Sequence, residues 1–242
     1  MIQFYAPDIE NSPFLPESDS QHCVRVLRMK SGDIIEVIDG KGNRYECKIL
    51  DAHQKRTCVE IINKQPIPLS WGNNITIAVA PTKHLDRMEW LVEKLTEVGV
   101  NRIVPLLCRY SERKEIKIER LEKIAIAAMK QSLKTVLPTI EPMTPFKNFI
   151  CEYNAQQKFI AYCDQSIPRL LFSNEYIANK DTIILIGPEG DFSQEEIKLS
   201  LDNGYTPISL GENRLRTETA ALVACNTCHI INQINQINQI NQ

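Results

Sequence analysis

An apolar run stops abruptly at a glycine in the sequence Ile183-Ile184-Leu185-Ile186-Gly187-Pro188-Glu189-Gly190. Four consecutive apolar side chains suit a strand buried on both faces of a parallel sheet, so Asp181 to Ile186 is predicted to be such a strand. Gly187 and Gly190 allow backbone conformations that are closed to other residues, and Pro188 lacks a backbone donor. The carboxyl end of this strand is therefore expected to present main-chain groups to a ligand.

A helix is predicted directly after this loop. Ser193 and Glu196 have the spacing of a capping box, so the helix begins at about Gln194 and ends near Asn203-Gly204. An ordinary strand-to-helix turn would have the same pattern. Residues 187–190, called the GPEG loop below, therefore do not specify a site by themselves.

A second polar loop follows the next predicted strand, in the sequence Leu210-Gly211-Glu212-Asn213-Arg214-Leu215-Arg216-Thr217-Glu218-Thr219-Ala220. Tyr205 to Leu210 is predicted as the strand, which again ends at a glycine, and Leu215 to about Cys225 as a helix of good helix formers. Core packing does not require so many functional groups, and loops of this kind usually carry chemistry. Neither loop matches the dinucleotide or P-loop fingerprint. We expect the two loops to be halves of one site.

Taken together, the two loops resemble the SPOUT class of S-adenosylmethionine-dependent RNA methyltransferases, and within it the ribosomal RNA small subunit methyltransferase E family. The resemblance covers most of the chain, including His22 to Arg28, Met88 to Val100 and Gln131-Ser132. Two departures stand out. Asp191 replaces a second glycine that commonly follows the GPEG loop, and Leu133-Lys134 replaces glycine and arginine. Lysine keeps the charge but loses the bidentate fork, so altered RNA contacts are expected there.

The resemblance implies an α/β fold with a SPOUT-type, trefoil-knotted, parallel-sheet C-terminal domain and a small N-terminal PUA-like β-barrel. Periodicity alone would predict an ordinary open parallel sheet, because a knot is a rare exception to unthreaded topology. Alternating strands and helices support the α/β class, with predicted strands at Ile75 to Ala80, Ile103 to Leu107 and Phe159 to Cys163. An apolar stripe from Leu85 to Val98 predicts a helix that Gly99 ends. A second stripe contains Leu121, Ile124, Ala128 and Met129.

The first 70 residues have a different pattern. Short strands are predicted at Ile34 to Ile38, Tyr45 to Leu50 and Thr57 to Ile62, and they indicate a small barrel. Gln65 to Pro68 is interpreted as a stiff linker. The boundary is placed near Leu69, so that residues 1–69 form the RNA-binding barrel and residues 70–242 the methyltransferase domain.

By resemblance, the chain transfers the methyl group of S-adenosylmethionine to N3 of a uridine in 16S rRNA, and three sets of site residues follow. The cofactor-binding set is Leu185, Ile186, Gly187, Pro188, Glu189, Gly190, Leu210, Gly211, Leu215, Arg216, Thr219 and Ala220. The catalytic set is Arg216, Glu189, Glu218 and Thr217. The RNA-binding set is Arg25, Arg28, Lys83, Arg109, Arg113, Gln131 and Lys134.

The chemistry of N3 methylation suggests roles for these side chains. Arg216 can stabilise negative charge that develops on the uracil carbonyls. Glu189 or Glu218 can accept the N3 proton. For Glu218, a carboxylate that stabilises the start of a helix is an equally good interpretation. His22 and His84 are conceivable bases, but structural or RNA-contacting roles are expected for both.

Composition fits a globular protein that binds nucleic acid through its middle segment. The 242 residues are 43% hydrophobic and 24% charged, with a net charge of −2. Residues 83–134 nevertheless hold 12 basic and 8 acidic side chains, so this part could contact phosphates. For Lys117 to Lys123 a solvated helix with internal ion pairs is preferred. The sequence has no apolar run long enough to span a membrane and no leader at its start, so a cytoplasmic location is expected.

Neither a metal nor haem is expected. The eight cysteines are interpreted as reduced thiols. Cys225 to His229 has the CxxCH form of haem attachment, but it falls in a predicted helix. Haem is attached in this way to exported proteins, and no export signal is recognised in this sequence. A zinc site would need a second pair of ligands.

The expected partners are 16S rRNA or the assembled small subunit, together with a second copy of the chain. The helices Leu85 to Val98 and Leu215 to Cys225 are candidate faces for the homodimer. Four Ile-Asn-Gln copies fill residues 231–242; the first can extend the last helix, and the rest is expected to be a fraying, association-prone end. Two alternatives stay open: a non-catalytic RNA-binding ribosome assembly factor, and an enzyme that acts on a small nucleotide.

Overall fold

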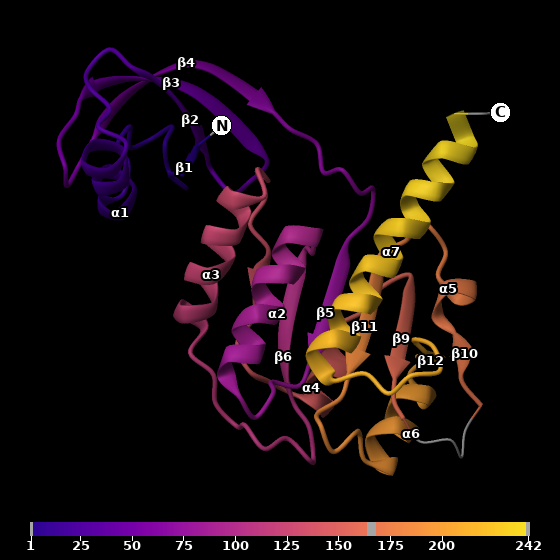
Figure 1. Ribbon diagram of the computed structural model, residues 1–242. Coiled ribbons are helices and arrows are strands. Elements are labelled where there is room, and N and C mark those ends of the chain that lie inside the picture. The colour runs from indigo at the N-terminus through magenta and orange to yellow at the C-terminus, as the bar shows by residue number, and fades with distance from the viewer. Residues whose placement is uncertain (1, 164–167, 241–242) are drawn as a thin grey trace. The chain divides into compact units, whose positions relative to one another are not determined.

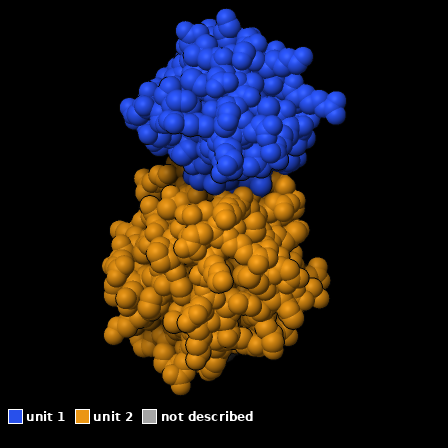
Figure 2. Space-filling view, turned by 90° about the vertical axis from the view of Figure 1, so that its left-hand side faces the viewer, with its two compact units in different colours: residues 1–70, 126–137 blue, residues 71–125, 138–242 orange. Residues whose placement is uncertain are grey.

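The structure is a computed structural model that describes residues 2–163 and 168–240. It has two compact units, residues 1–70 with 126–137 and residues 71–125 with 138–242 (Figure 2). The division falls inside helix α3 (Ile118–Gln131). Residues 126–137, which the sequence-based division assigns to the second domain, group with the first unit because they bind its backbone. The amide of Gly42 donates to Thr135, and the amide of Leu137 donates to Gly40.

The first unit contains a four-stranded sheet in the order β1-β2-β3-β4. The strands are β1 (Gln3–Tyr5), β2 (Ile34–Ile38), β3 (Asn43–Asp51) and β4 (Cys58–Pro66). The three predicted strands are confirmed as β2, β3 and β4, whereas the short β1, which pairs parallel to β2, was not predicted. Helix α1 (Glu17–Gln21) and a turn of π-helix, η1 (His22–Val26), follow β1. The predicted linker is wrong at its start, because Gln65 and Pro66 pair with β3 as part of β4.

A buried carboxylate organises the turn between β2 and β3. The side chain of Asp39 accepts hydrogen bonds from the backbone amides of Lys41 and Asn43, from the Asn43 side chain and from the Tyr45 hydroxyl. Desolvation would raise the pKa of Asp39, but these four hydrogen bonds outweigh it and lower the pKa. The turn is therefore fixed by an ionised side chain.

The second unit is built on a parallel sheet in the order β10-β12-β9-β11-β5-β6-β7, with β8 paired to β6 (Figure 1). Its strands are β5 (Ile75–Val79), β6 (Arg102–Leu107), β7 (Thr139–Ile140), β8 (Thr144–Pro145), β9 (Gln157–Ala161), β10 (Leu170–Leu171), β11 (Thr182–Ile186) and β12 (Thr206–Ser209). Every residue of β5 and β11 is buried, as expected for central strands of a parallel sheet. The parallel α/β class predicted from the sequence is confirmed. The knot stays a prediction.

Helices cover both faces of this sheet. Helix α2 (Leu85–Val98) packs against α7 (Thr217–Ile240), and α7 also contacts β5 and β11. On the other face, α4 (Phe146–Glu152) and α6 (Gln194–Asp202) contact each other and share a core with Ala78, Val104 and Leu185. The short α5 (Phe172–Glu175) lies against α7.

Two of the predicted helix boundaries are confirmed. Helix α2 ends at Gly99, whose φ of +120° suits only glycine without strain. Helix α6 begins at Gln194, and Ser193 before it forms the predicted capping box, in which Ser193 and Glu196 exchange hydrogen bonds.

The predicted end of the last helix is wrong, because α7 continues from Thr217 to Ile240 through the Ile-Asn-Gln copies. Asn232 of the first copy is buried and fixes this extension. Its side chain donates to Asn73 and accepts from the Tyr176 hydroxyl and the Asn179 amide. The last two residues of the fourth copy lie outside the described residues. Among the described residues, no helix combines the length and the apolar character that a membrane span requires.

Candidate functional site

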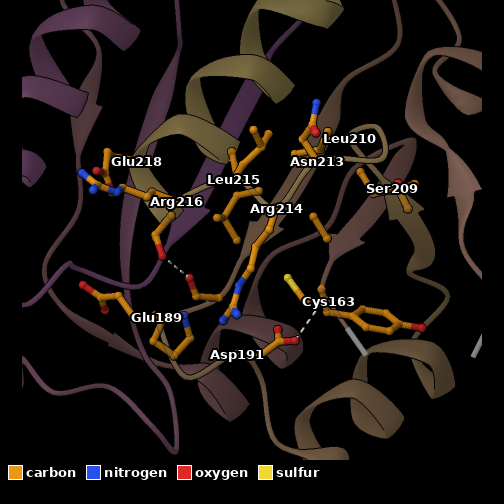
Figure 3. A pocket seen from close by; sticks show the side chains of 18 of the residues that line it. Cys163, Glu189, Asp191, Ser209, Leu210, Asn213, Arg214, Leu215, Arg216 and Glu218 are labelled. Carbon is orange, nitrogen blue, oxygen red and sulfur yellow. Dashed lines mark hydrogen bonds between the residues drawn. The ribbon is translucent and has the colours of Figure 1, made fainter. Parts of the chain in front are cut away.

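A cavity of about 430 Å³ opens at the carboxyl ends of β9, β11 and β12 (Figure 3). It is lined by the GPEG loop, by the second polar loop, by the ends of these strands and by one side chain of α2. The lining residues are Arg87, Ala161, Tyr162, Cys163, Arg169, Ile186, Gly187, Pro188, Glu189, Gly190, Asp191, Ile208, Ser209, Leu210, Gly211, Asn213, Arg214, Leu215, Arg216, Thr217, Glu218 and Ala220. The two polar loops therefore meet at one cavity, as the sequence predicts.

The prediction that Gly187 and Gly190 adopt backbone conformations closed to other residues is wrong, because neither has a positive φ; both instead pack closely against aromatic residues. A Cβ atom on Gly187 would lie 3.1 Å from the ring of Phe192, and one on Gly190 would lie 3.2 Å from Tyr110 Cβ. Both distances are tighter than ordinary van der Waals contact. The absent side chains leave the main chain of the loop at the cavity wall.

A hydrogen bond joins the two loops. The Thr217 hydroxyl donates to the Gly187 carbonyl over 3.1 Å. Thr217 begins α7, so this bond ties the start of that helix to the end of β11. Thr217 thus has a structural use that the sequence does not reveal, and its hydroxyl faces the neighbouring loop.

Glu218 is the most unusual charged group at the cavity. It is 7% exposed, its Oε1 lies 3.8 Å from Nε of Arg87, and its Oε2 is buried without a hydrogen-bond partner among the described residues. An unpaired buried oxygen is costly unless a ligand or solvent supplies the missing donor. Glu218 therefore has a free acceptor position at the edge of the cavity.

Glu189 has a different environment. It is exposed, and its Oε1 accepts a hydrogen bond from the backbone amide of Lys83 over 2.9 Å. Arg113 donates to the carbonyls of Thr82 and Lys83 over 3.1 Å and 2.7 Å, so the loop between β5 and α2 is held from two sides. Glu189 and Arg113 therefore both hold the backbone of the loop between β5 and α2.

Arg214 and Arg216 carry positive charge on opposite sides of the second loop. Both side chains are exposed, and neither makes a hydrogen bond or ion pair within the described parts of the chain. In Figure 3 Arg216 extends toward Glu218, whereas Arg214 extends toward Asp191. Both guanidinium groups are available to an anionic or electron-rich ligand.

Most of the predicted cofactor-binding residues line the cavity, but two do not. Leu185 is fully buried in the core shared with α4 and α6, and Thr219 lies half-buried in the first turn of α7. Several lining residues were missed, among them Arg87, Cys163 and Arg169. Cys163 follows β9, a predicted strand, and parallel strands share one carboxyl edge, so this residue could have been inferred. Arg87 reaches the cavity by tertiary packing of α2 and has no local signal.

The predicted RNA-binding residues divide between the two units. Arg25, Arg28, Gln131 and Lys134 belong to the first, and Lys83, Arg109 and Arg113 to the second. The Arg25 side chain donates to Gln54 over 2.6 Å. The Arg109 backbone amide donates to Glu196, while the exposed guanidinium of Arg109 has no partner among the described residues. Lys83 pairs with Glu112 over 2.8 Å, and this hydrogen bond raises the pKa of Lys83.

Packing accounts for the CxxCH sequence. Cys225 and Cys228 are fully buried in α7, and the Cys225 thiol donates to the Gly99 carbonyl. Burial raises the pKa of Cys225 to about 12. His229 also contacts the Gly99 carbonyl, over 2.6 Å. No group of three or more metal-ligating side chains occurs within residues 2–163 and 168–240.

Two protein-family models match this chain, each over a different segment. Residues 70–229 match the RNA methyltransferase domain family, and residues 15–62 match the RNA methyltransferase PUA domain family. The ribosomal RNA small subunit methyltransferase E of Buchnera aphidicola is 32% identical over 90% of this chain and 87% of its own.

Two crystal structures have closely similar folds. A probable rRNA-methyltransferase from Porphyromonas gingivalis superimposes with a TM-score of 0.93 and is 45% identical, covering 97% of this chain and 100% of its own. The ribosomal RNA small subunit methyltransferase E of Neisseria gonorrhoeae, bound to S-adenosyl methionine, has a TM-score of 0.83 and 25% identity over 96% of this chain and 98% of its own. By these matches over most of its length, the chain belongs to the ribosomal RNA small subunit methyltransferase E family.

Proposed function

We propose that this protein transfers the methyl group of S-adenosylmethionine to N3 of a uridine in 16S rRNA. The observation that carries the proposal is the cavity at which the GPEG loop and the second polar loop meet. Its volume of about 430 Å³ lies within the range of small-molecule sites. Relatives whose names state an rRNA substrate, one of them bound to S-adenosyl methionine, support the same assignment.

The lining residues fit such a donor. The main chain of Gly187 and Gly190 would accommodate a flat heterocycle and its hydrogen bonds. When bound, S-adenosylmethionine supplies an electrophilic methyl group on a sulfonium. Ile186, Gly187, Pro188, Gly190, Leu210, Gly211, Leu215 and Ala220 would hold it.

The catalytic roles follow from what uridine N3 requires. Its proton must leave, and the negative charge left on the uracil carbonyls must be stabilised. Of the two candidate bases, we favour Glu218, because its Oε2 is unpaired, whereas Glu189 already accepts the Lys83 amide. Arg216, exposed beside Glu218, would stabilise the uracil anion. Fixed geometry between nitrogen and methyl group can lower the barrier by about 7–11 kcal/mol.

RNA would be bound by exposed or half-buried side chains of both units. We assign this role to Arg25, Arg28, Gln131 and Lys134 in the first unit and to Lys83 and Arg109 in the second. Residues 1–69 would serve RNA binding and residues 70–242 methyl transfer. We also propose a homodimer through α2 and α7 and action in the cytoplasm, where the rRNA substrate or the assembled small subunit is found.

Two measurements test the proposal. Calorimetric titration of the full chain with S-adenosylmethionine should give a heat of binding, and its absence would contradict the enzyme assignment in favour of an assembly factor that only binds RNA. Mass spectrometry of small-subunit RNA from cells with and without the gene should show one 3-methyluridine that depends on the gene. A methyl group on another base or position would contradict the uridine N3 assignment alone.

A further inference from the structure

Asp191, directly after the GPEG loop, has a backbone conformation that glycine adopts more readily than any other residue. Its φ is +66°, in the left-handed region where glycine is at ease and other residues are strained. Aspartate can adopt this conformation at a modest cost, and its side chain offers hydrogen-bond acceptors that glycine lacks.

The side chain joins two loops at the cavity. Asp191 Oδ2 accepts a hydrogen bond from the backbone amide of Cys163 over 2.8 Å (Figure 3). Its Oδ1 accepts from the amide of Phe192 over 2.9 Å. The Asp191 amide in turn donates to the Pro188 carbonyl. One residue thus fixes the end of the GPEG loop and the chain that leaves β9.

These two segments follow neighbouring strands of the sheet. Strands β9 and β11 pair in parallel register from Gln157 and Thr182 onward, and Cys163 and Asp191 come after their carboxyl ends. Both residues line the cavity. A bond between them therefore sets the separation of two cavity walls, which the backbone hydrogen bonds of the sheet no longer control beyond Ala161 and Ile186.

We propose that Asp191 is a positioning residue for the methyl donor, because it holds the Cys163 segment against the GPEG loop and so forms the donor pocket before the ligand arrives. A pocket formed in advance binds more tightly, since the ligand does not have to order it. The inference rests on the proposed donor, S-adenosylmethionine.

Cysteine chemistry provides a measurement that does not depend on activity. Cys163 and Cys151 are exposed, Cys58 is half-buried, and the other cysteines are buried. Burial raises the pKa of Cys23 to about 11 and the pKa of Cys47 to about 12, so such thiols react slowly near pH 8. Cys163 lines the cavity and Cys151 does not, which makes Cys151 an internal reference.

The experiment combines iodoacetamide alkylation, read residue by residue by mass spectrometry, with calorimetric titration of S-adenosylmethionine. Three variants separate the roles of Asp191. Asp191→Gly removes the carboxylate and the backbone strain, Asp191→Ala removes the carboxylate alone, and Asp191→Asn keeps one acceptor. Cys163→Ser confirms which alkylated peptide reports on the cavity.

In the wild-type protein, S-adenosylmethionine should slow alkylation of Cys163 and leave Cys151 unchanged. In Asp191→Gly and Asp191→Ala, Cys163 should react several-fold faster than in the wild type without donor, and the Kd of the donor should rise about tenfold, as expected for one lost charged hydrogen bond. Asp191→Asn should be intermediate.

The outcomes separate this inference from the proposed function. If Asp191→Gly binds the donor as tightly as the wild type and Cys163 reacts at the same rate, Asp191 has no positioning role, although the donor assignment stands. If the wild type itself neither binds the donor nor protects Cys163, the proposed donor is wrong and the inference is overturned with it. A weaker donor affinity in Asp191→Gly at an unchanged melting temperature would support positioning over general stabilisation.

Discussion

Oε1 of Glu218 lies 3.8 Å from Nε of Arg87, while the other oxygen of the same carboxylate is buried and has no hydrogen-bond partner among the described residues. The two residues come from the ends of different helices, α7 and α2, that pack against each other. Arg87 partly neutralises the Glu218 carboxylate, and the second oxygen of Glu218 can accept a hydrogen bond or a proton from a bound ligand. A buried carboxylate with one unpaired oxygen destabilises the folded protein, so this arrangement indicates a functional role for Glu218.

Replacing Glu218 by glutamine should lower kcat of methyl transfer by about 10²- to 10⁴-fold, because an amide cannot accept the N3 proton. The affinity for S-adenosylmethionine should stay within a few-fold. The melting temperature should not fall, since a neutral amide is cheaper to bury than a carboxylate with a free oxygen. Single-turnover transfer to small-subunit RNA, calorimetry and thermal unfolding measure the three quantities.

Glu195→Gln is the matched control, because Glu195 occupies the first turn of α6 as Glu218 does in α7 but is exposed and outside the cavity. It should leave kcat unchanged. Equal, small effects of the two substitutions would mean that Glu218 only stabilises the start of its helix through the dipole.

Arg216→Ala should reduce kcat by about 10²- to 10³-fold, the usual effect of removing one group that stabilises a developing anion. Because its guanidinium has no described partner, the substitution should not change the melting temperature. Arg216→Lys should recover part of the rate, since it keeps the charge and loses the planar fork. Full transfer by Arg216→Ala would exclude a catalytic role for this residue, whatever the family.

Arg113 and Arg109 should behave differently, although the sequence assigns both to RNA. The Arg113 guanidinium donates hydrogen bonds to the Thr82 and Lys83 carbonyls, so Arg113→Ala should destabilise the protein by about 1–3 kcal/mol. The Arg109 guanidinium is free of described partners, so Arg109→Ala should leave stability unchanged and reduce the slope of log K against log salt by about 0.7–0.9. Urea unfolding and filter binding to small-subunit RNA at several salt concentrations measure these effects. A loss of stability in Arg109→Ala, or a changed salt dependence without loss of stability in Arg113→Ala, would contradict these roles.

Local signals explain what could be predicted from the sequence. The strand at Thr182–Ile186, the capping box at Ser193 and the end of α2 at Gly99 each depend on residues within one or two turns of chain. Parallel strands share a carboxyl edge, and this rule was enough to bring the GPEG loop and the second polar loop together. Most of the cavity wall therefore followed from two short segments.

Tertiary packing explains what could not be predicted. Arg87 lies in α2 beside the apolar stripe, with no local sequence signal for a site, and the packing of α2 against α7 brings it to Glu218. The length of α7 was missed for another reason. Its repeat of three fits neither 3.6 nor 2, yet it contains no glycine or proline to end a helix, and the buried Asn232 holds it in place. Grouping of residues 126–137 with the first unit depends on two backbone bonds without sequence signals.

Acid should remove the contribution of Asp39 to stability. Hydrogen bonds lower its pKa in the folded protein below the ordinary value of 3.8, so the group stabilises the fold above that value and loses its effect as pH falls through the lowered folded pKa. Asp39→Asn should therefore cost about 1–3 kcal/mol at pH 7 and much less near pH 2, by urea unfolding followed with circular dichroism. Asp51→Asn, an exposed carboxylate at the end of β3, should cost little at either pH. A cost for Asp39→Asn that is independent of pH would show that the side chain acts without its charge.

Three asparagines at equivalent places in the Ile-Asn-Gln repeat should differ sharply in their effect on stability. Asn232→Ala removes partners from the Asn73 side chain, the Tyr176 hydroxyl and the Asn179 amide, all within a buried network, and should cost about 2–3 kcal/mol. Asn235→Ala and Asn238→Ala, which leave that network intact, should stay within about 0.5 kcal/mol, since alanine also favours the helix. Urea unfolding of the three variants measures this difference. Equal effects at all three positions would mean that the repeat contributes through helix propensity alone, and that Asn232 does not anchor α7.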